Sequence, residues 1–231
     1  MSTPRPLSTH PDLHLVRHDP DPKTVSVLRW EDERAVAAVL ADAFVDDPLV
    51  MAICPGTVPE RRRRIWWSFR VAVRGHYLAK QPAWTTLDPT GTPESVVLAI
   101  RPYPAQPQIS DFAFALRSLL RMGIVAAVRG ARAAQIIAAH APPQPFTYLR
   151  TLGVDPKYQG RGRGSRLVES VIQSAPAAFP IYLETAKEQN LSFYARHGVS
   201  CSGEFTCIGV RVWRLLRAAR VGHGLDMNRE P

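Results

Sequence analysis

The chain has 231 residues, of which 45% are hydrophobic and 21% charged, so it can bury a sizeable core and is not a disordered polypeptide. Lys and Arg number 29 against 20 Asp and Glu, which gives a net charge of +9, and only four of the cations are lysines. Because a guanidinium is a forked donor suited to phosphate and carboxylate, this balance favours an anionic partner: a nucleotide, nucleic acid or a membrane surface.

Residues 1–22 contain five prolines and three histidines and predict a disordered or loosely packed N-terminal arm. His10, His14 and His18 recur every four residues, but the intervening prolines disfavour a helical metal patch. The arm has no apolar signal-peptide core. We expect one domain over residues 23–218 and a tail over 219–231.

Two further features indicate a cytoplasmic protein that binds no membrane. The longest uncharged stretch, residues 133–149, contains three prolines and cannot span a bilayer as one helix. Cys54, Cys201 and Cys207 have no metal-ligand spacing, so we expect no metal and reduced thiols, with a Cys201–Cys207 disulfide as the alternative in a secreted protein.

Apolar periodicity, capping residues and Gly/Pro boundaries predict alternating strands and helices. A helical segment at about 104–145 interrupts the strands, and we interpret it as an insertion that covers a cleft. Strands are expected at 25–28, 83–87, 95–100, 146–154 and 180–184 and as a pair within 199–216. Helices are expected from a first turn with the acids at 31–33 to a stop at 46–48, and at 59–80, 112–122, 124–139, 160–174 and 188–197. This is an α/β pattern with a mixed sheet.

Arg61 to Arg64 form a run of four cations near the start of the helix expected at 59–80. Cations at a helix N-terminus oppose the helix dipole, so the run is not explained by helix stability. It indicates either a solvated face, which we favour, or a patch for phosphate or nucleic acid.

The most informative stretch joins a strand to a helix through a glycine-rich loop at 159–165. Gly160, Gly162 and Gly164 remove side chains where backbone would approach a ligand, and the free N–H groups of the next helix can bind a pyrophosphate. The loop is neither a Walker A loop nor a dinucleotide fingerprint. A loop that only reverses the chain is the alternative.

The motif Gln159-x-x-Gly162-x-Gly164 resembles the coenzyme loop of the GNAT acetyltransferases. Around it, 152–156, 182–185 and 190–198 resemble that superfamily's strand before the loop, its next strand and its Asn-x-x-x-Tyr-x-x-x-Gly helix. Within the superfamily, 146–198 is most similar to the puromycin N-acetyltransferases, whereas the segments expected to line an acceptor, 43–84 and 104–145, match too weakly to carry substrate residues across.

The resemblance implies an α/β fold with a mixed, mostly antiparallel sheet of six or seven strands, flanked by helices and splayed between the fourth and fifth strands. It implies acetyl-CoA as co-substrate and transfer to a primary amine of a small molecule, such as an aminonucleoside or antibiotic, with drug resistance as a candidate role. The residues that it assigns to the coenzyme are Leu152, Gly153, Val154, Gln159, Gly160, Arg161, Gly162, Arg163, Gly164, Ser165 and Asn190.

Two side chains are candidates for catalysis. The resemblance places Tyr194 near the coenzyme sulfur, where a hydroxyl can protonate a departing thiolate. Glu184 is the candidate base because it ends a strand and faces the cleft if Ile181 and Leu183 face the core. It can instead bind the acceptor's cation or be an exposed strand-end carboxylate. A backbone N–H at Val154 or its neighbour is the candidate oxyanion donor.

Other assignments stay open at this point. Asp46 and Asp47 are candidates for recognising a basic acceptor, although an Asp-Pro that ends a helix is the simpler interpretation. The alternative for Tyr194 is a half-buried residue of the hydrophobic core with no catalytic role. The alternative function is a basic nucleic-acid or regulatory module on a degenerate acetyltransferase fold, but no nucleic-acid motif is visible. The sequence predicts a monomer or homodimer.

Overall fold

The computed structural model describes residues 24–103, 116 and 119–220. The expected arm at 1–22, most of the helix at 112–122 and most of the tail at 219–231 lie outside these residues. The described elements, in chain order, are β1 (Val25–Val27), α1 (Glu33–Phe44), α2 (Pro48–Ile53), α3 (Val58–Leu78), β2 (Ala83–Leu87), β3 (Pro93–Tyr103), α5 (Ile124–Ala139), β4 (Phe146–Val154), α6 (Arg163–Ser174), β5 (Ile181–Thr185), α7 (Asn190–Ala195), β6 (Ser200–Cys207) and β7 (Val210–Arg217).

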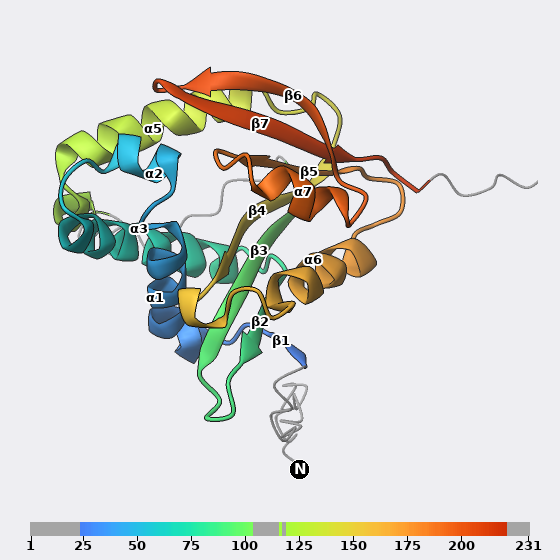
Figure 1. The fold of residues 1–231 in the computed structure, drawn as a ribbon, viewed down its shortest axis with the longest axis horizontal. Helices are drawn as coiled ribbons and strands as arrows, with labels where there is room; N and C mark the ends of the chain where they lie inside the picture. The colour runs from blue at the N-terminus through green and yellow to red at the C-terminus, as the bar shows by residue number, and fades with distance from the viewer. Residues whose placement is uncertain (1–23, 104–115, 117–118, 221–231) are drawn as a thin grey trace, which may run out of the picture.

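The strands form one seven-stranded sheet in the order β1-β2-β3-β4-β5-β7-β6. Every neighbouring pair is antiparallel except β4 and β5, which are parallel. This is the mixed, mostly antiparallel sheet expected from the sequence. β4 and β5 diverge in the middle of the molecule (Figure 1), and their pairing covers only Thr147 with Ile181 and Tyr148 with Tyr182.

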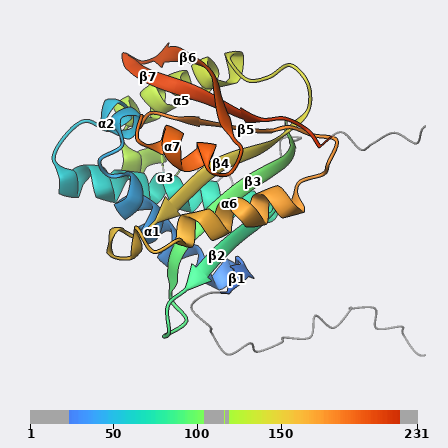
Figure 2. The same cartoon turned by 45° about the vertical axis from the view of Figure 1, so that its right-hand side comes forward.

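Helices cover both faces of the sheet. α1 packs against β3 and β4 on one face, and α6 packs against β2, β3 and β4 on the other (Figure 2). Two apolar clusters follow from this arrangement. Val96 and Leu98 of β3 pack with α1, whereas Val97 and Ala99 pack with α6, because successive strand residues point to opposite faces. The core therefore lies on both sides of the strands that hold the site.

The arginine run at the start of α3 holds neighbouring segments together. Arg61 is 7% exposed, and its side chain donates to the carbonyl oxygens of Val45 at 2.6 Å and Gly56 at 3.0 Å. Arg62 pairs with Asp42 of α1, and Arg64 donates to the carbonyl of Pro55 at 3.1 Å. The expectation of a solvated face is therefore wrong for Arg61, and three of the four cations already have partners within the protein.

The turn between α1 and α2 also differs from the expectation. Asp47 and Pro48 do more than end α1, because they begin α2: the Asp47 carboxylate accepts from the N–H groups of Leu49 and Val50 at 2.9 and 3.2 Å. Asp followed by Pro is a strong helix start as well as a stop.

Some findings concern the described residues as a whole. No helix among them is both long and apolar enough to cross a bilayer. No group of three or more His, Cys, Asp or Glu side chains among them is placed to hold a metal ion. The three cysteines are free thiols.

Candidate active site

A cavity of about 780 Å³ opens where β4 and β5 separate. Most of its lining comes from four parts of the chain: the exposed edge of β4, the loop before α6, the segment from the end of β5 through α7, and the turn between α1 and α2. Single residues of α3, α5 and β7 complete it. The cavity thus includes every residue assigned to the coenzyme and to catalysis from the sequence except Arg161, which does not line it.

One wall of the cavity is a strand edge without a partner. β4 pairs with β3 from Phe146 to Val154, but with β5 only at Thr147 and Tyr148. Over the rest of β4, no described strand pairs with the edge that faces β5. Such an edge presents N–H and C=O groups that can bind an extended ligand as an added strand.

β4 also contains a bulge beside this edge. The register with β3 passes from Leu98 opposite Thr151 to Ala99 opposite Leu149, so Arg150 is the extra residue. Bulges change the direction of a strand and of its side chains. The exposed side chain of Arg150 lines the cavity.

The loop at 159–165 closes one end of the cavity. Gly160 and Gly162 have φ angles of +73° and +77°, in the left-handed region that favours glycine. Gly162 is the N-cap residue of α6, so the helix begins three residues later than predicted. Gln159 folds the loop back by donating from Nε2 to the carbonyl of Val154 at 3.1 Å. The first N–H groups of a helix have no partner within that helix and can bind an anion, and the positive end of the helix dipole adds to the attraction.

The two arginines of the loop differ in their surroundings. Arg163 pairs with Glu94 of β3, which is 1% exposed and also accepts from the Thr86 hydroxyl at 3.1 Å. This ion pair fixes the start of α6 to the sheet and neutralises much of the Arg163 charge. Arg161 is exposed, with its guanidinium 5.8 Å from the ring of Tyr158. Arg163 lines the cavity and Arg161 does not, so the loop arginine that faces the cavity already has a carboxylate partner.

Glu184 faces the cavity from β5. Leu183 packs in the cluster beneath α6, so Glu184 points to the opposite face, as expected from strand alternation. The Tyr148 hydroxyl donates to Oε2 of Glu184 at 2.8 Å, and Oε1 is enclosed without a hydrogen-bond partner among the described residues. Burial raises the pKa of Glu184 to about 7, although donation from Tyr148 acts in the other direction. A carboxyl with this pKa exchanges its proton near neutral pH.

Asn190 and Tyr194 both line the cavity from α7, as their four-residue spacing predicts. Asn190 donates from Nδ2 to the Thr185 hydroxyl at 2.9 Å, which fixes the amide group. Tyr194 is 6% exposed and belongs to the apolar cluster with Leu149 and Leu183. Burial raises the pKa of its hydroxyl, so the group stays protonated at neutral pH.

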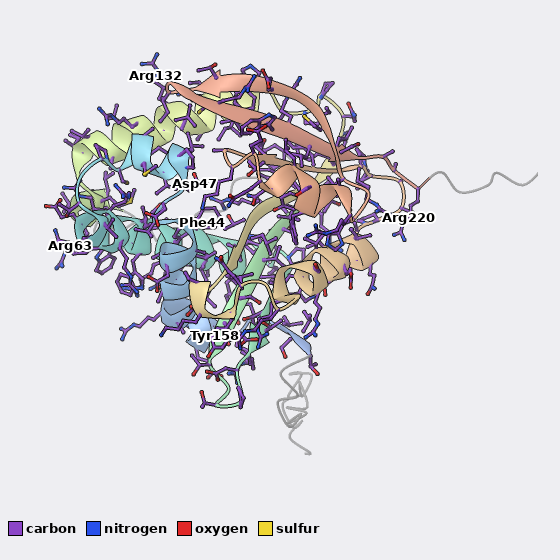
Figure 3. The ribbon with its side chains drawn as sticks, in the orientation of Figure 1. Phe44, Asp47, Arg63, Arg132, Tyr158 and Arg220 are labelled. Carbon is purple, nitrogen blue, oxygen red and sulfur yellow. The ribbon has the colours of Figure 1, made fainter. Side chains whose placement is uncertain are left out.

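The other end of the cavity is mostly apolar and contains one further carboxylate. Asp47 lines this end and is 8% exposed, whereas Asp46 is exposed and does not line it. Both N–H groups that bind Asp47 reach Oδ1, and Oδ2 has no hydrogen-bond partner among the described residues. Phe44 and Asp47 lie between α2 and β4 (Figure 3). The apolar residues of this end are Phe44, Leu49, Val50, Phe69, Ile137 and Val212.

The polar residues of the cavity that sequence reasoning missed include Tyr148, Arg150 and Lys187. The signal for Tyr148 was weak, because a tyrosine within an apolar strand is typical of a core position. Its role depends on the parallel register that brings it beside Glu184. From the expected helical segment, α5 contributes Ile137 to the cavity lining, and the interpretation of that segment as an insertion that covers a cleft stays a prediction.

Comparison with known proteins agrees with this geometry. Residues 94–199 match the model of the Acetyltransferase (GNAT) family. A crystal structure titled "histone acetyltransferase HPA2 and related acetyltransferase" from Corynebacterium glutamicum superposes with a TM-score of 0.67 at 21% identity, covering 87% of this chain and 98% of that one.

Two further solved structures share the fold. An N-acetyltransferase from Staphylococcus aureus has a TM-score of 0.51 at 14% identity and covers 84% of this chain and 99% of that one. A putative phosphinothricin N-acetyltransferase has a TM-score of 0.50 at 16% identity and covers 85% of this chain and 98% of that one. The family match contains the glycine loop, β4, β5 and α7.

Proposed function

We propose that this protein, an acetyltransferase of the GNAT family, transfers an acetyl group from acetyl-CoA directly to a primary amine of a small molecule in the cytoplasm. The observation that carries the proposal is the composition of one cavity. A free strand edge and a glycine-rich loop at a helix N-terminus stand at one end, and a buried carboxyl with a pKa of about 7 stands beside an apolar chamber at the other. Both reactants can therefore meet in one space, and positioning them lowers the barrier.

The coenzyme end fits acetyl-CoA, which supplies a thioester that is activated toward attack by an amine. Backbone groups of Leu152, Gly153 and Val154 would bind the pantetheine arm, with Asn190 beside it, and residues 159–165 would bind the pyrophosphate. Gly153 also lets α1 approach β4, because a Cβ there would lie 2.7 Å from Cδ2 of Leu40. The coenzyme edge and the acceptor chamber are thereby held close together.

The acceptor amine must be neutral to attack the thioester. Glu184 accepts its proton as general base, and its pKa of about 7 suits this role near neutral pH. Tyr194 protonates the departing thiolate, which its raised pKa allows because the hydroxyl keeps its proton. The N–H of Val154 or its neighbour donates to the developing oxyanion. The three groups lie on β5, α7 and β4, on different sides of one cavity.

The chamber supports an acceptor whose amine is carried on an apolar or aromatic body. Its walls are formed by six apolar side chains, and Asp47 provides a carboxylate oxygen for a donor group on the acceptor. An aminonucleoside or an antibiotic fits this description, and drug resistance is the biological role that would follow. Puromycin is therefore one acceptor to be assayed.

Thermal unfolding with and without acetyl-CoA tests the coenzyme assignment. At 100 times Kd, binding to the native state contributes about 2.7 kcal/mol, which raises the Tm of a protein of this size by roughly 5–10 °C. Gly162→Glu places a carboxylate at the loop and should abolish the shift. Gly91→Glu is the matched control, since Gly91 has a φ of +82° in the β2–β3 turn and does not line the cavity.

The acceptor is identified with a panel of amines, puromycin included, by measuring the release of free CoA thiol. Thiol release that depends on an amine supports the proposal. If acetyl-CoA raises the Tm equally in Gly162→Glu and wild type, the loop does not bind the pyrophosphate and the coenzyme assignment is wrong.

A further inference from the structure

One side chain that the proposed chemistry does not use stands directly behind the glycine loop. His197 follows α7, and its side chain is only 10% exposed. Its Nε2 lies 3.2 Å from the hydroxyl oxygen of Ser165, which is near the start of α6 and lines the cavity. The imidazole therefore contacts the loop from the side opposite to the space where a ligand would lie.

The surrounding structure fixes the position of this imidazole. The His197 N–H donates to the carbonyl of Tyr194 at 2.9 Å, and the His197 carbonyl accepts from Arg217 at 2.5 Å. The ring packs edge-to-face against Phe193 at 5.3 Å. Its second nitrogen, Nδ1, is 4.0 Å from a Glu169 oxygen, which is too long for a hydrogen bond.

The direction of the Ser165 side chain is informative. A serine within a helix commonly bonds the carbonyl one turn back, as Ser170 does with Arg166 at 3.0 Å. Ser165 instead contacts His197, and it has no other hydrogen-bond partner among the described residues. A hydroxyl has one proton to donate. If the imidazole Nε2 accepts that proton, Ser165 cannot donate to a ligand; if Nε2 donates to the Ser165 oxygen, it can.

We propose that His197 is a positioning residue for the coenzyme: it donates from Nε2 to the Ser165 oxygen, and this leaves the hydroxyl proton for a pyrophosphate oxygen. The inference rests on the proposed function, because it requires a pyrophosphate at the loop. An anion in the cavity favours the arrangement in which Nε2 carries the proton, since only then can Ser165 donate to the anion. The loop would then bind the coenzyme through a side-chain donor as well as backbone N–H groups.

Two substitutions of His197 separate donation from packing. His197→Phe keeps an aromatic ring against Phe193 but removes the donor, whereas His197→Gln keeps an amide N–H that can take the place of Nε2. Ser165→Ala removes the hydroxyl, and Ser165→Ala combined with His197→Phe completes a double-mutant cycle. The probes are acetyl-CoA and S-acetylpantetheine, which has the same thioester and arm but no pyrophosphate.

We expect Ser165→Ala and His197→Phe each to raise the Kd for acetyl-CoA about tenfold, the size of a lost hydrogen bond to a charged group. The double variant should bind no more weakly than either single variant, and His197→Gln should bind nearly as tightly as wild type. The KM for S-acetylpantetheine should change by less than about twofold in all four. A variant that contains less folded protein would lose activity with both probes equally, so the ratio between the two probes is independent of that loss.

Other results would overturn the inference. Additive losses in the double variant would show that His197 acts independently of Ser165. Equal losses for acetyl-CoA and S-acetylpantetheine would show a merely structural role. A wild-type protein that uses S-acetylpantetheine as well as acetyl-CoA would reject this inference and the pyrophosphate assignment of the loop, whereas acetyl transfer to an amine would stand. If wild type binds neither probe, the proposed function fails and this inference fails with it.

Discussion

Glu184 gives the sharpest quantitative test, because its ionisation should be visible in protein stability without any substrate. Its pKa is 4.5 in an unfolded chain and about 7 in the fold. At 1.36 kcal/mol per unit, the difference amounts to about 3 kcal/mol. Between these pH values the folded chain retains a proton that the unfolded chain has lost, so the free energy of unfolding falls as pH rises from about 4.5 to about 7. Above pH 7 the loss is complete.

Glu184→Gln removes this titration and keeps the shape of the side chain. Urea unfolding at pH 5 and pH 8 measures the effect, and roughly 2–3 kcal/mol of the total falls within that interval. Wild type should lose that much more stability than Glu184→Gln between the two pH values, because the contributions of other groups cancel in the comparison. Glu188→Gln, which removes an exposed carboxylate, controls for the loss of one surface charge.

The same variant tests the catalytic role. With Glu184 as base, kcat/KM in wild type should rise through about pH 7, and Glu184→Gln should lower it by roughly 10²–10⁴-fold. Identical pH dependence of stability in wild type and Glu184→Gln would refute the reasoning about burial. If Glu184→Gln loses the pH dependence of the free energy of unfolding but keeps the wild-type kcat/KM, the burial argument stands and Glu184 is not the base.

Three further predictions follow from the same cavity. Tyr148→Phe removes a hydrogen bond to the ionised Glu184, so the rise in kcat/KM should move above pH 7; a profile at unchanged pH would contradict the contact. Tyr194→Phe should lower kcat about 10²-fold and leave the Kd for acetyl-CoA unchanged, as single-turnover and binding assays can show. Asp47→Asn keeps the cap of α2 but removes the charge, so it should raise the KM of a basic acceptor about tenfold, whereas Asp46→Asn should not.

Much of the fold was predictable because its signals are local. The bounds of α5 and β4 agree with the prediction at both ends, since Gly123 precedes the helix and prolines precede the strand. The start of α6 was predicted three residues early. Gly160 and Gly162 adopt left-handed φ angles, so the same glycines that mark the loop also postpone the helix.

Charge was harder to interpret than periodicity. The run at Arg61–Arg64 indicated a solvated face or an anionic partner, but Arg61 is buried against two backbone carbonyl oxygens. Those oxygens belong to the turns that flank α2, a helix the sequence did not predict. The partners of a charged side chain therefore depend on turns whose positions are set by tertiary packing.

The residues of the candidate site also differ in whether local sequence or distant contacts determine their positions. The glycine loop is visible from local spacing, and the family resemblance assigns Asn190 and Tyr194, whose four-residue separation places both on one helix face. Tyr148 and the bulge at Arg150 depend on the register between strands that are distant in the sequence. A register shift of one residue would turn Tyr148 away from Glu184, and the sequence of β4 alone does not determine it.

The separation of β4 and β5 is the feature on which the cavity depends, and packing explains it better than the strand sequences do. Tyr194 of α7 belongs to one buried cluster with Leu149 of β4 and Leu183 of β5, the residues just beyond the last paired positions. Because one buried cluster joins α7 to both strands, we expect the tyrosine ring to help keep them apart, in addition to the chemistry proposed for its hydroxyl. Tyr194→Phe, which retains the ring, separates the two roles because only the hydroxyl is lost.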